Sequence, residues 1–430
     1  MSPVVVDETL ALSFRLLAAL TLVGVPAYAW RVRGRTYAIF ALVILALSLP
    51  GAVLAHERLR TWLSPAATTV ADGAFAFCMA AAGLHLVALV RPRLRTRAFR
   101  WLVSVPGMAF VAAGTLSGLW LLALLPVRAA LALLGYESAL DGLRWLDLVP
   151  FVIAVVSILT SYRLADEIVR VRLGKAGPET VSRLPVERYR RRPPEPLTRR
   201  PLRIVQITDP HLGPWQPVHR LQRRIGDLID REPDLVLLTG DFLTMEGMGS
   251  PGALREALAP LRAVSERCFA IFGNHDHESA EEVRAALAAN GIRLLVDEEI
   301  VTETAVGPVQ IVGADYVGRG RGDHIRALLA RFPRRRDVLR LFLLHDPSGF
   351  RHVPVGDVDL TLSGHTHGGQ LGLVSFGLDW TVLSRTRWPD HGLFGHGANR
   401  LYVHRGTGFY GFPLRIGVPG ELSILELVQE

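Results

Sequence analysis

Histidine, aspartate and asparagine side chains recur at five places in the second half of this 430-residue chain, each directly after a short apolar run. Imidazole nitrogens with carboxylate and amide oxygens, and no thiolate, suit manganese, iron or zinc in octahedral or nearly octahedral coordination. One Asp–His pair on a loop is more often a surface hydrogen bond, whereas five such places in one chain predict a metal centre. The five motifs are Asp209-Pro210-His211, Gly240-Asp241, Gly273-Asn274-His275-Asp276, His345-Asp346 and Gly364-His365-Thr366-His367-Gly368-Gly369-Gln370.

The apolar runs before these motifs are short and alternate with helical patterns, which predicts an α/β domain. Because ligands of such domains lie beyond the carboxyl ends of the strands, we expect the five motifs to meet at one edge of the domain. The predicted strands are residues 202–208, 235–239, 268–272, 339–344 and 359–363, and the predicted helices are residues 218–231 and 253–264.

In their order along the chain, these motifs resemble the signature of the calcineurin-like metallophosphoesterase superfamily, which is D-x-H, G-D, G-N-H-[DE], H and G-H-x-H. The resemblance covers residues 201–430 and implies a metallophosphoesterase domain folded as an αββα sandwich. The GHTHGGQ sequence at 364–370, the HDP sequence at 345–347 and the Arg405-Gly406-Thr407-Gly408 ending are similar to a bacterial, membrane-associated subfamily. That subfamily includes phosphodiesterases that act on lipid-linked substrates.

The resemblance implies two divalent metal ions (manganese, iron or zinc) and a metal-bridging hydroxide that attacks phosphorus. Two cations about 3.5–4 Å apart repel each other and need a shared negative ligand, and Asp241 would be that bridge. One ion would be held by Asp209, His211, Asp241 and His367, and the other by Asp241, Asn274, His345 and His365.

Two further residues near these motifs are candidates for substrate contact. The resemblance implies that His275 is a catalytic residue, which faces the substrate, stabilises developing charge and protonates the leaving oxygen. Many relatives carry G-D-x-x-D, whose second aspartate orients this histidine, but Thr244 stands at that position here. Glu246 or Asp276 could replace it. Arg405 has a planar guanidinium that suits phosphate oxygens, although structural pairing is the alternative.

The first 165 residues hold most of the apolar excess of a chain that is 50% hydrophobic. A membrane span needs about 20 mostly apolar residues, and five segments approach this, of which the first contains Arg15 and the fifth is the shortest. We therefore predict a transmembrane helical domain over 1–165 with about five spans, a basic Pro-rich linker over 166–200 whose first residues could prolong the last helix, and the metallophosphoesterase domain over 201–430. The candidate spans are residues 10–30, 36–55, 71–90, 101–127 and 147–162.

The net charge of +8 comes from arginines that cluster beside the apolar segments and in the linker. That placement favours a lipid bilayer as the partner, and we expect no nucleic-acid binding. Arginine is richer at 31–35, at 91–100 and after 163 than in the alternate loops. The positive-inside rule then predicts an integral protein of the bacterial plasma membrane with its N-terminus outside and its catalytic domain in the cytoplasm.

Three functions are compatible with this organisation. The first is a membrane-anchored phosphoesterase that hydrolyses a phosphate ester, with a phosphodiester of a lipid-linked or membrane-associated substrate favoured. The second is a tethered phosphoesterase for a soluble nucleotide or phosphoprotein, and the third is a non-enzymatic membrane scaffold. The intact set of ligand residues argues against the third. Aromatic residues between 376 and 412 are interpreted either as core or as a hydrophobic entrance for acyl chains or membrane.

Overall fold

The computed structural model describes residues 8–429 apart from 175, 191–194 and 196. The chain divides into two compact units, one formed by residues 1–159 with Gly411–Ile416 and the other by Thr160–Tyr410 with Gly417–Glu430.

The secondary structure of residues 8–159 in the first unit consists of helices joined by short loops. Five of its helical stretches are long and apolar enough to cross a membrane, and each contains one of the five segments predicted from the sequence. The fifth stretch reaches 26 residues because α6, η2 and α7 follow one another without a break. The helices are α1 (Glu8–Val32), α2 (Arg35–Trp62), α3 (Pro65–Val90), α4 (Arg97–Phe99), η1 (Arg100–Ser104), α5 (Val105–Leu133), α6 (Glu137–Leu143), η2 (Arg144–Leu148) and α7 (Val149–Tyr162).

Small residues allow close helix contacts in this unit. A Cβ atom on Gly51 of α2 would lie 2.2 Å from the carbonyl oxygen of Gly114 in α5, so glycine is required where these helices cross. Ser117 Oγ donates a hydrogen bond of 3.3 Å to the Gly51 carbonyl at the same crossing. Close approach through glycine and serine is the usual packing mode of helices in a bilayer. His85 of α3 is also buried.

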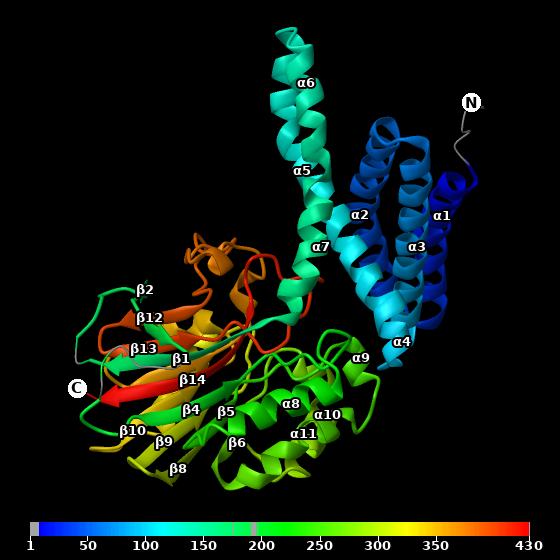
Figure 1. The fold of residues 1–430 in the computed structure, drawn as a ribbon. Helices are drawn as coiled ribbons and strands as arrows, with labels where there is room; N and C mark the ends of the chain where they lie inside the picture. Colours follow the sequence, from blue (N-terminus) through cyan, green and yellow to red (C-terminus); the bar gives the residue numbers. More distant parts are fainter. Residues whose placement is uncertain (1–7, 175, 191–194, 196, 430) are drawn as a thin grey trace. The chain divides into compact units, whose positions relative to one another are not determined.

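The second unit contains two seven-stranded mixed sheets (Figure 1). The strand order is β3-β1-β14-β4-β5-β6-β7 in the first sheet and β2-β12-β13-β11-β10-β9-β8 in the second. The strands are β1 (Leu164–Leu173), β2 (Ser182–Arg183), β3 (Glu187–Tyr189), β4 (Leu202–Ile207), β5 (Leu235–Leu238), β6 (Cys268–Ala270), β7 (Arg293–Leu294), β8 (Glu298–Thr304), β9 (Gly307–Gly313), β10 (Leu339–Leu343), β11 (Leu360–Ser363), β12 (Gly392–His396), β13 (Asn399–Val403) and β14 (Gly420–Gln429).

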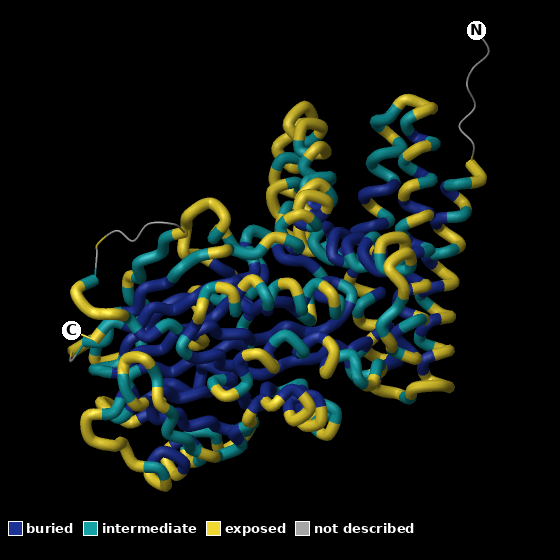
Figure 2. The backbone as a smooth tube through the Cα atoms, turned by 60° about the horizontal axis from the view of Figure 1, so that its bottom comes forward, coloured by how far each residue is buried: buried dark blue, intermediate teal, exposed yellow. Residues whose placement is uncertain are grey.

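The core lies between the sheets and beneath the helices that cover them. Apolar side chains of both sheets, including Ile204, Leu237 and Leu341, form one buried cluster. Figure 1 shows α8 (Val218–Ile229), α10 (Ala253–Ala257) and α11 (Ala280–Ala288) over the first sheet. Ile325 of α12 (Arg321–Arg331) packs on Phe342 of the second sheet. Strands buried on both faces have nearly continuous apolar sequences, and they form the dark core of Figure 2. The predicted αββα architecture is confirmed.

The structure differs from the sequence-based expectation at the segment predicted as a linker. Residues 164–173 form strand β1 and do not extend the last helix. β1 pairs in parallel with β14 over its whole length, from Leu164↔Gly420 to Leu173↔Gln429. The helical interpretation was wrong because the alternation in Val169-Arg170-Val171-Arg172 has the two-residue period of a strand. Both valines are buried in the core between the sheets, and Arg170 is buried beside Glu426 of β14.

The rest of that predicted linker also contributes strands. β2 pairs with β12 and β3 pairs with β1, so the catalytic unit begins well before residue 201. Residues 191–194 and 196 of the predicted proline-rich tether lie outside the described residues. A smaller difference concerns the helix predicted at 253–264, which is divided into α10 and the 3₁₀ helix η3 (Ala259–Arg267).

Candidate metal centre

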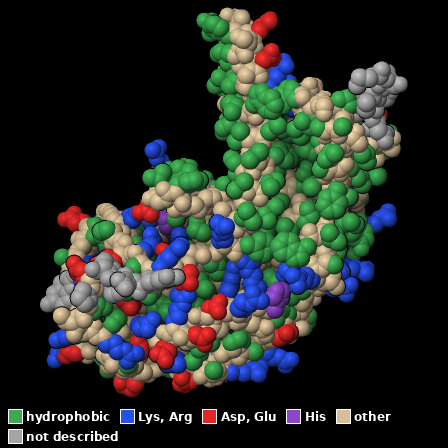
Figure 3. All heavy atoms as spheres, viewed as in Figure 1, with side chains coloured by type: hydrophobic (Ala, Val, Ile, Leu, Met, Phe, Trp, Pro, Cys, Tyr) green, Lys and Arg blue, Asp and Glu red, His purple; other side chains and the backbone are tan. Residues whose placement is uncertain are grey.

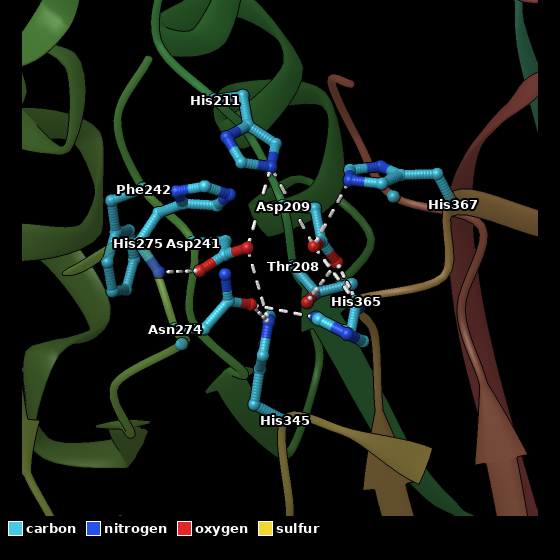
Figure 4. Close-up of polar contacts among 12 residues, drawn as sticks. Thr208, Asp209, His211, Asp241, Phe242, Asn274, His275, His345, His365 and His367 are labelled. Carbon is cyan, nitrogen blue, oxygen red and sulfur yellow. Dashed lines mark hydrogen bonds and ion pairs between the residues drawn. The ribbon is translucent and has the colours of Figure 1, made fainter. Parts of the chain in front are cut away.

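The five sequence motifs meet at one edge of the sandwich, directly after the strands that carry them. β4, β5 and β6 of the first sheet and β10 and β11 of the second sheet all run into this edge. The seven predicted metal ligands and His275 therefore converge from both sheets (Figure 4).

The backbone at this edge is strained where the predicted ligands stand. Asp209, His211, Asp241, His365 and His367 all have positive φ, between 41° and 68°. Residues with a Cβ atom rarely adopt this left-handed region, and such strain concentrates at functional sites.

Two glycines permit the close approach of the loops. A Cβ on Gly364 would lie 2.1 Å from Asp209 Oδ2, and one on Gly273 would lie 2.2 Å from Asp241 Oδ1.

One cluster of potential ligands is formed by Asp209, His211 and His367. His211 Nε2 lies 3.9 Å from Asp209 Oδ1, and His367 Nε2 lies 3.6 Å from the same oxygen. The other ring nitrogen of His211 donates to the Leu243 carbonyl, which leaves Nε2 pointing into the cluster. That Nε2 atom is buried and has no hydrogen-bond partner among the described residues. A buried, unsatisfied imidazole nitrogen facing a carboxylate fits a metal ligand.

A second cluster is formed by Asp241, His345 and His365, with Asn274 in contact with the two imidazoles. His345 Nε2 lies 3.2 Å from Asp241 Oδ2 and 3.2 Å from Asn274 Oδ1. His365 Nδ1 lies 2.8 Å from the same asparagine oxygen. The Nδ1 group of His345 donates to the Thr239 carbonyl at 2.6 Å, which fixes the ring so that Nε2 faces its neighbours.

Asp241 lies between the two clusters. Its Oδ2 atom is 3.7 Å from His211 Nε2 on one side and 3.2 Å from His345 Nε2 on the other. Its Oδ1 atom accepts the backbone N–H of His275 at 2.9 Å. The carboxylate is thus held by the neighbouring loop with one oxygen facing both groups of potential ligands, as a bridging ligand requires.

The backbone around Asp241 is held in turn by Asp276. This buried carboxylate accepts the backbone N–H groups of Asp241, Phe242 and Gly273 at 2.7–2.8 Å. It therefore ties the loop after β5 to the loop after β6. The prediction that Asp276 could orient the His275 side chain is not supported, because its oxygens are used for these backbone contacts.

Burial and mutual charge set the protonation of the potential ligands. Burial lowers the pKa of His211 to about 4 and the pKa of His365 to about 4, so both rings are neutral at pH 7, as metal ligation requires. Burial acts in the same direction on His345, but the Asp241 carboxylate outweighs it and raises the pKa of His345 to about 10. Metal ligation at this position would therefore release a proton. Burial raises the pKa of Asp209 to about 7.

The chemistry of the two clusters fits a pair of divalent transition-metal ions. All the donor atoms are imidazole nitrogens or carboxylate and amide oxygens, a set that suits manganese, iron or zinc. Cys268 does not join them, because its thiol is buried on β6 and donates to the Val264 carbonyl.

The His275 side chain has a partner that the sequence analysis missed. Its Nδ1 atom lies 2.8 Å from Glu278 Oε1, one turn further along the chain. Glu246, the other residue proposed from the sequence, instead accepts a hydrogen bond from Thr244 Oγ1 at 2.9 Å. The available signal was the three-residue spacing between His275 and Glu278, which places two side chains on the same side of a helical turn.

Arg405, the predicted substrate contact, is buried in an ion-pair network. Its guanidinium lies 3.2 Å from Glu421 and also pairs with Glu167. These carboxylates outweigh the effect of burial and raise the pKa of Arg405 further. The structure thus supports structural pairing and not substrate contact. The pairing with Glu167 could not be expected from the sequence because that residue stands in the segment predicted as a linker.

Aromatic rings complete the surroundings of the two clusters. Tyr410 stacks on His211 at a centroid distance of 5.2 Å and meets His275 edge-on at 5.1 Å. Tyr316 lies on the other side, with its ring 6.4 Å from that of His365. The sequence analysis placed Tyr410 only within a general aromatic group, because no local pattern links it to either histidine.

Comparisons with known proteins agree with this geometry. The profile of the calcineurin-like phosphoesterase family matches residues 202–369. The phosphodiesterase YaeI of Escherichia coli (strain K12) is 31% identical over 233 residues, which cover 53% of this chain and 83% of that protein. The transmembrane protein with metallophosphoesterase domain of Danio rerio is 29% identical over 57% of this chain, and its counterpart from Bos taurus is 27% identical over 67%. The chain covers 56% and 65% of these two proteins.

Proposed function

Because this chain belongs to the calcineurin-like metallophosphoesterase family and is a phosphoester hydrolase, we propose that it is anchored in a membrane and cleaves a phosphodiester of a lipid-linked or membrane-associated substrate. The observation that carries the proposed mechanism is the position of Asp241 Oδ2 between two clusters of imidazole and carboxylate groups. The membrane part of the proposal is supported by five apolar helices and by the similarity to the two transmembrane relatives.

Each group at the site then has a proposed task. Asp209, His211, Asp241 and His367 would hold one ion, and Asp241, Asn274, His345 and His365 would hold the other. Two bound ions would activate water at neutral pH and neutralise charge on the phosphoryl oxygens. His275 would stabilise the departing oxygen and donate a proton to it, with its ring held by Glu278.

A membrane anchor favours a substrate that stays at the same surface. Helix α7 ends at Tyr162, and strand β1 of the catalytic unit begins at Leu164. Only Arg163 lies between that helix and that strand. Confinement of enzyme and substrate to one surface raises the effective concentration of the substrate without new contacts.

The catalytic proposal predicts metal-dependent hydrolysis of an activated phosphodiester. The full-length protein, purified in detergent and stripped with a chelator, should lose hydrolysis of bis-p-nitrophenyl phosphate and regain most of it with Mn²⁺. The product p-nitrophenolate gives the rate, and p-nitrophenyl phosphate tests preference for monoesters. Unchanged turnover after verified metal removal would contradict the mechanism. Release of phosphorylated headgroups from lipid extracts, with soluble nucleotides and phosphopeptides in parallel, separates the two enzymatic alternatives.

The anchoring proposal predicts which loops face the cytoplasm. In intact bacterial cells that express the full chain, a cysteine at exposed Ser64 should react with an impermeant maleimide. Cysteines at Arg93 and Val306, also exposed, should react only after permeabilisation. The protein without an introduced cysteine gives the background from Cys78 and Cys268. The opposite labelling pattern would place the catalytic unit outside the cytoplasm.

A further inference from the structure

Exposed apolar side chains of the catalytic unit are concentrated in one loop. Among the described residues of this unit, eight large apolar side chains are exposed, and only Val306 and Val355 lie elsewhere. We call residues 371–388 the apolar loop. Such a concentration differs from the scattered apolar residues of an ordinary surface and marks an interaction site. The exposed side chains of the loop are Leu373, Phe376, Leu378, Trp380, Val382 and Trp388.

The backbone of the apolar loop is held in place by hydrogen bonds. Leu373 N–H donates to the Trp380 carbonyl at 2.9 Å, and Ser375 N–H donates to the Gly417 carbonyl at 2.8 Å. Further along the loop, the Thr381 hydroxyl donates to the Asp390 carboxylate at 2.6 Å. The apolar side chains are thus presented to the exterior by an ordered backbone.

The apolar loop is joined directly to the metal centre. It begins immediately after the His367-Gly368-Gly369-Gln370 segment, which carries one of the proposed ligands. A Cβ atom on Gly369 would lie 3.0 Å from the Leu383 side chain, so the segment and the loop pack closely. Thr366 Oγ1 also donates to the Asp390 carbonyl at 2.6 Å. The apolar loop is therefore anchored on the segment that carries His367.

The composition of the apolar loop fits a lipid surface. Two exposed arginines lie among the aromatic side chains, and the Arg387 guanidinium lies 5.5 Å from the centroid of the Trp388 ring. Asp379 is the one exposed acidic residue of this loop. Tryptophan rings favour the headgroup level of a bilayer, and arginines there contact lipid phosphates while their stems lie along apolar surface. Figure 3 shows hydrophobic side chains gathered over the segment that Figure 1 draws in orange.

The last apolar helix leads directly into the catalytic unit. Tyr162, the final residue of α7, belongs to this unit. Its carbonyl accepts hydrogen bonds from Arg220 and Arg224, and its ring lies 5.1 Å from that of Trp215. This attachment leaves little length of chain between the last apolar helix and the loop's own unit.

We propose that the apolar loop inserts its aromatic side chains into the headgroup region of the bilayer that anchors the chain. This contact rests on the proposed membrane anchoring, and it narrows the substrate class to a lipid whose phosphoester lies in the plane of that membrane. The loop would hold the metal centre at headgroup depth, so the substrate need not leave the bilayer.

The depth of the loop can be measured without any enzymatic turnover. The full-length protein carrying Phe376→Cys is labelled with a nitrobenzoxadiazole fluorophore and reconstituted into phosphatidylethanolamine–phosphatidylglycerol vesicles. Val355→Cys is the matched control, since this residue is also apolar and exposed, at 60% against 76% for Phe376. We expect shallow doxyl lipids to quench the label at 376 and aqueous iodide to quench the label at 355.

Two results would overturn the proposal. Quenching of the label at 376 by iodide and not by doxyl lipid would place the loop in water. Protection of that label from both quenchers would show that protein covers it, either a second copy of this chain or another part of it. Because neither readout needs catalysis, loss of the proposed enzymatic function would leave this test unaffected.

A second arm connects the loop to the substrate class. Phe376→Ser with Trp380→Ser should reduce turnover of a vesicle-embedded phosphodiester several-fold, because the site no longer sits at headgroup depth. Turnover of soluble bis-p-nitrophenyl phosphate should stay at the level of the unsubstituted protein, since neither residue belongs to the metal clusters. Equal losses on both substrates, or no loss on either, would contradict a role for the loop in presenting lipid substrates.

Discussion

Asp241→Asn should lower metal occupancy at both sites and abolish turnover. The substitution keeps an oxygen that can accept the His275 backbone N–H, so the loop should stay in place. It removes the negative charge that faces both clusters, at 3.7 Å from His211 and 3.2 Å from His345. Two dications that share no anionic ligand repel each other, and each also loses a ligand charge. Metal content per protein and bis-p-nitrophenyl phosphate turnover, measured on the same preparation, test this.

Asn274→Ala is the matched comparison, because the Asn274 amide oxygen contacts His345 and His365 of the second cluster. It should keep close to one tightly held ion per chain, since Asp209, His211, Asp241 and His367 remain. Circular dichroism and elution volume would establish whether both variants are folded. Near-normal binding of two ions by Asp241→Asn would exclude a bridging role for this carboxylate.

His275→Ala should retain both ions and lose turnover by about 10²–10⁴-fold, the usual contribution of a general acid or base. The expectation rests on the position of this ring, which lies beside the clusters and is held by Glu278. His324→Ala is the control, because His324 also contacts a carboxylate, Asp297, at 2.9 Å but belongs to neither cluster. Loss of one ion from His275→Ala would instead identify this residue as a ligand.

Glu278→Gln tests whether that carboxylate positions His275. The variant should reduce kcat with little change in KM, and the reduction should be larger for diesters with poor leaving groups than for bis-p-nitrophenyl phosphate. Poor leaving groups depend most on proton donation. The control is Glu281→Gln, an exposed glutamate of the neighbouring helix α11. A uniform loss across all leaving groups would indicate a structural role and not an effect through His275.

The sequence by itself determined the inventory of the site and the class of fold. The motifs of the site are recognisable because each follows a short buried strand. Each motif and its strand are neighbours along the chain, so their association can be read from the sequence. The apolar length of the helical segments is local as well, so five candidate spans could be counted before the structure was known. Parallel strands with helical connections then imply one edge where the motifs meet.

Only the tertiary structure decided which strands and which side chains pair with each other. The sequence of β1 has the alternation of a strand, but only the structure shows that its partner is β14, more than 200 residues later. Arg405 pairs with Glu167 of β1, and this ion pair favours a structural role for Arg405 over substrate contact. The carboxylates beside His275 differ in their partners because Asp276 accepts three backbone N–H groups while Glu278 reaches the ring. A side chain with several possible partners binds the one that packing brings within hydrogen-bond distance. The number of residues between two side chains does not determine how far apart they lie in the folded protein.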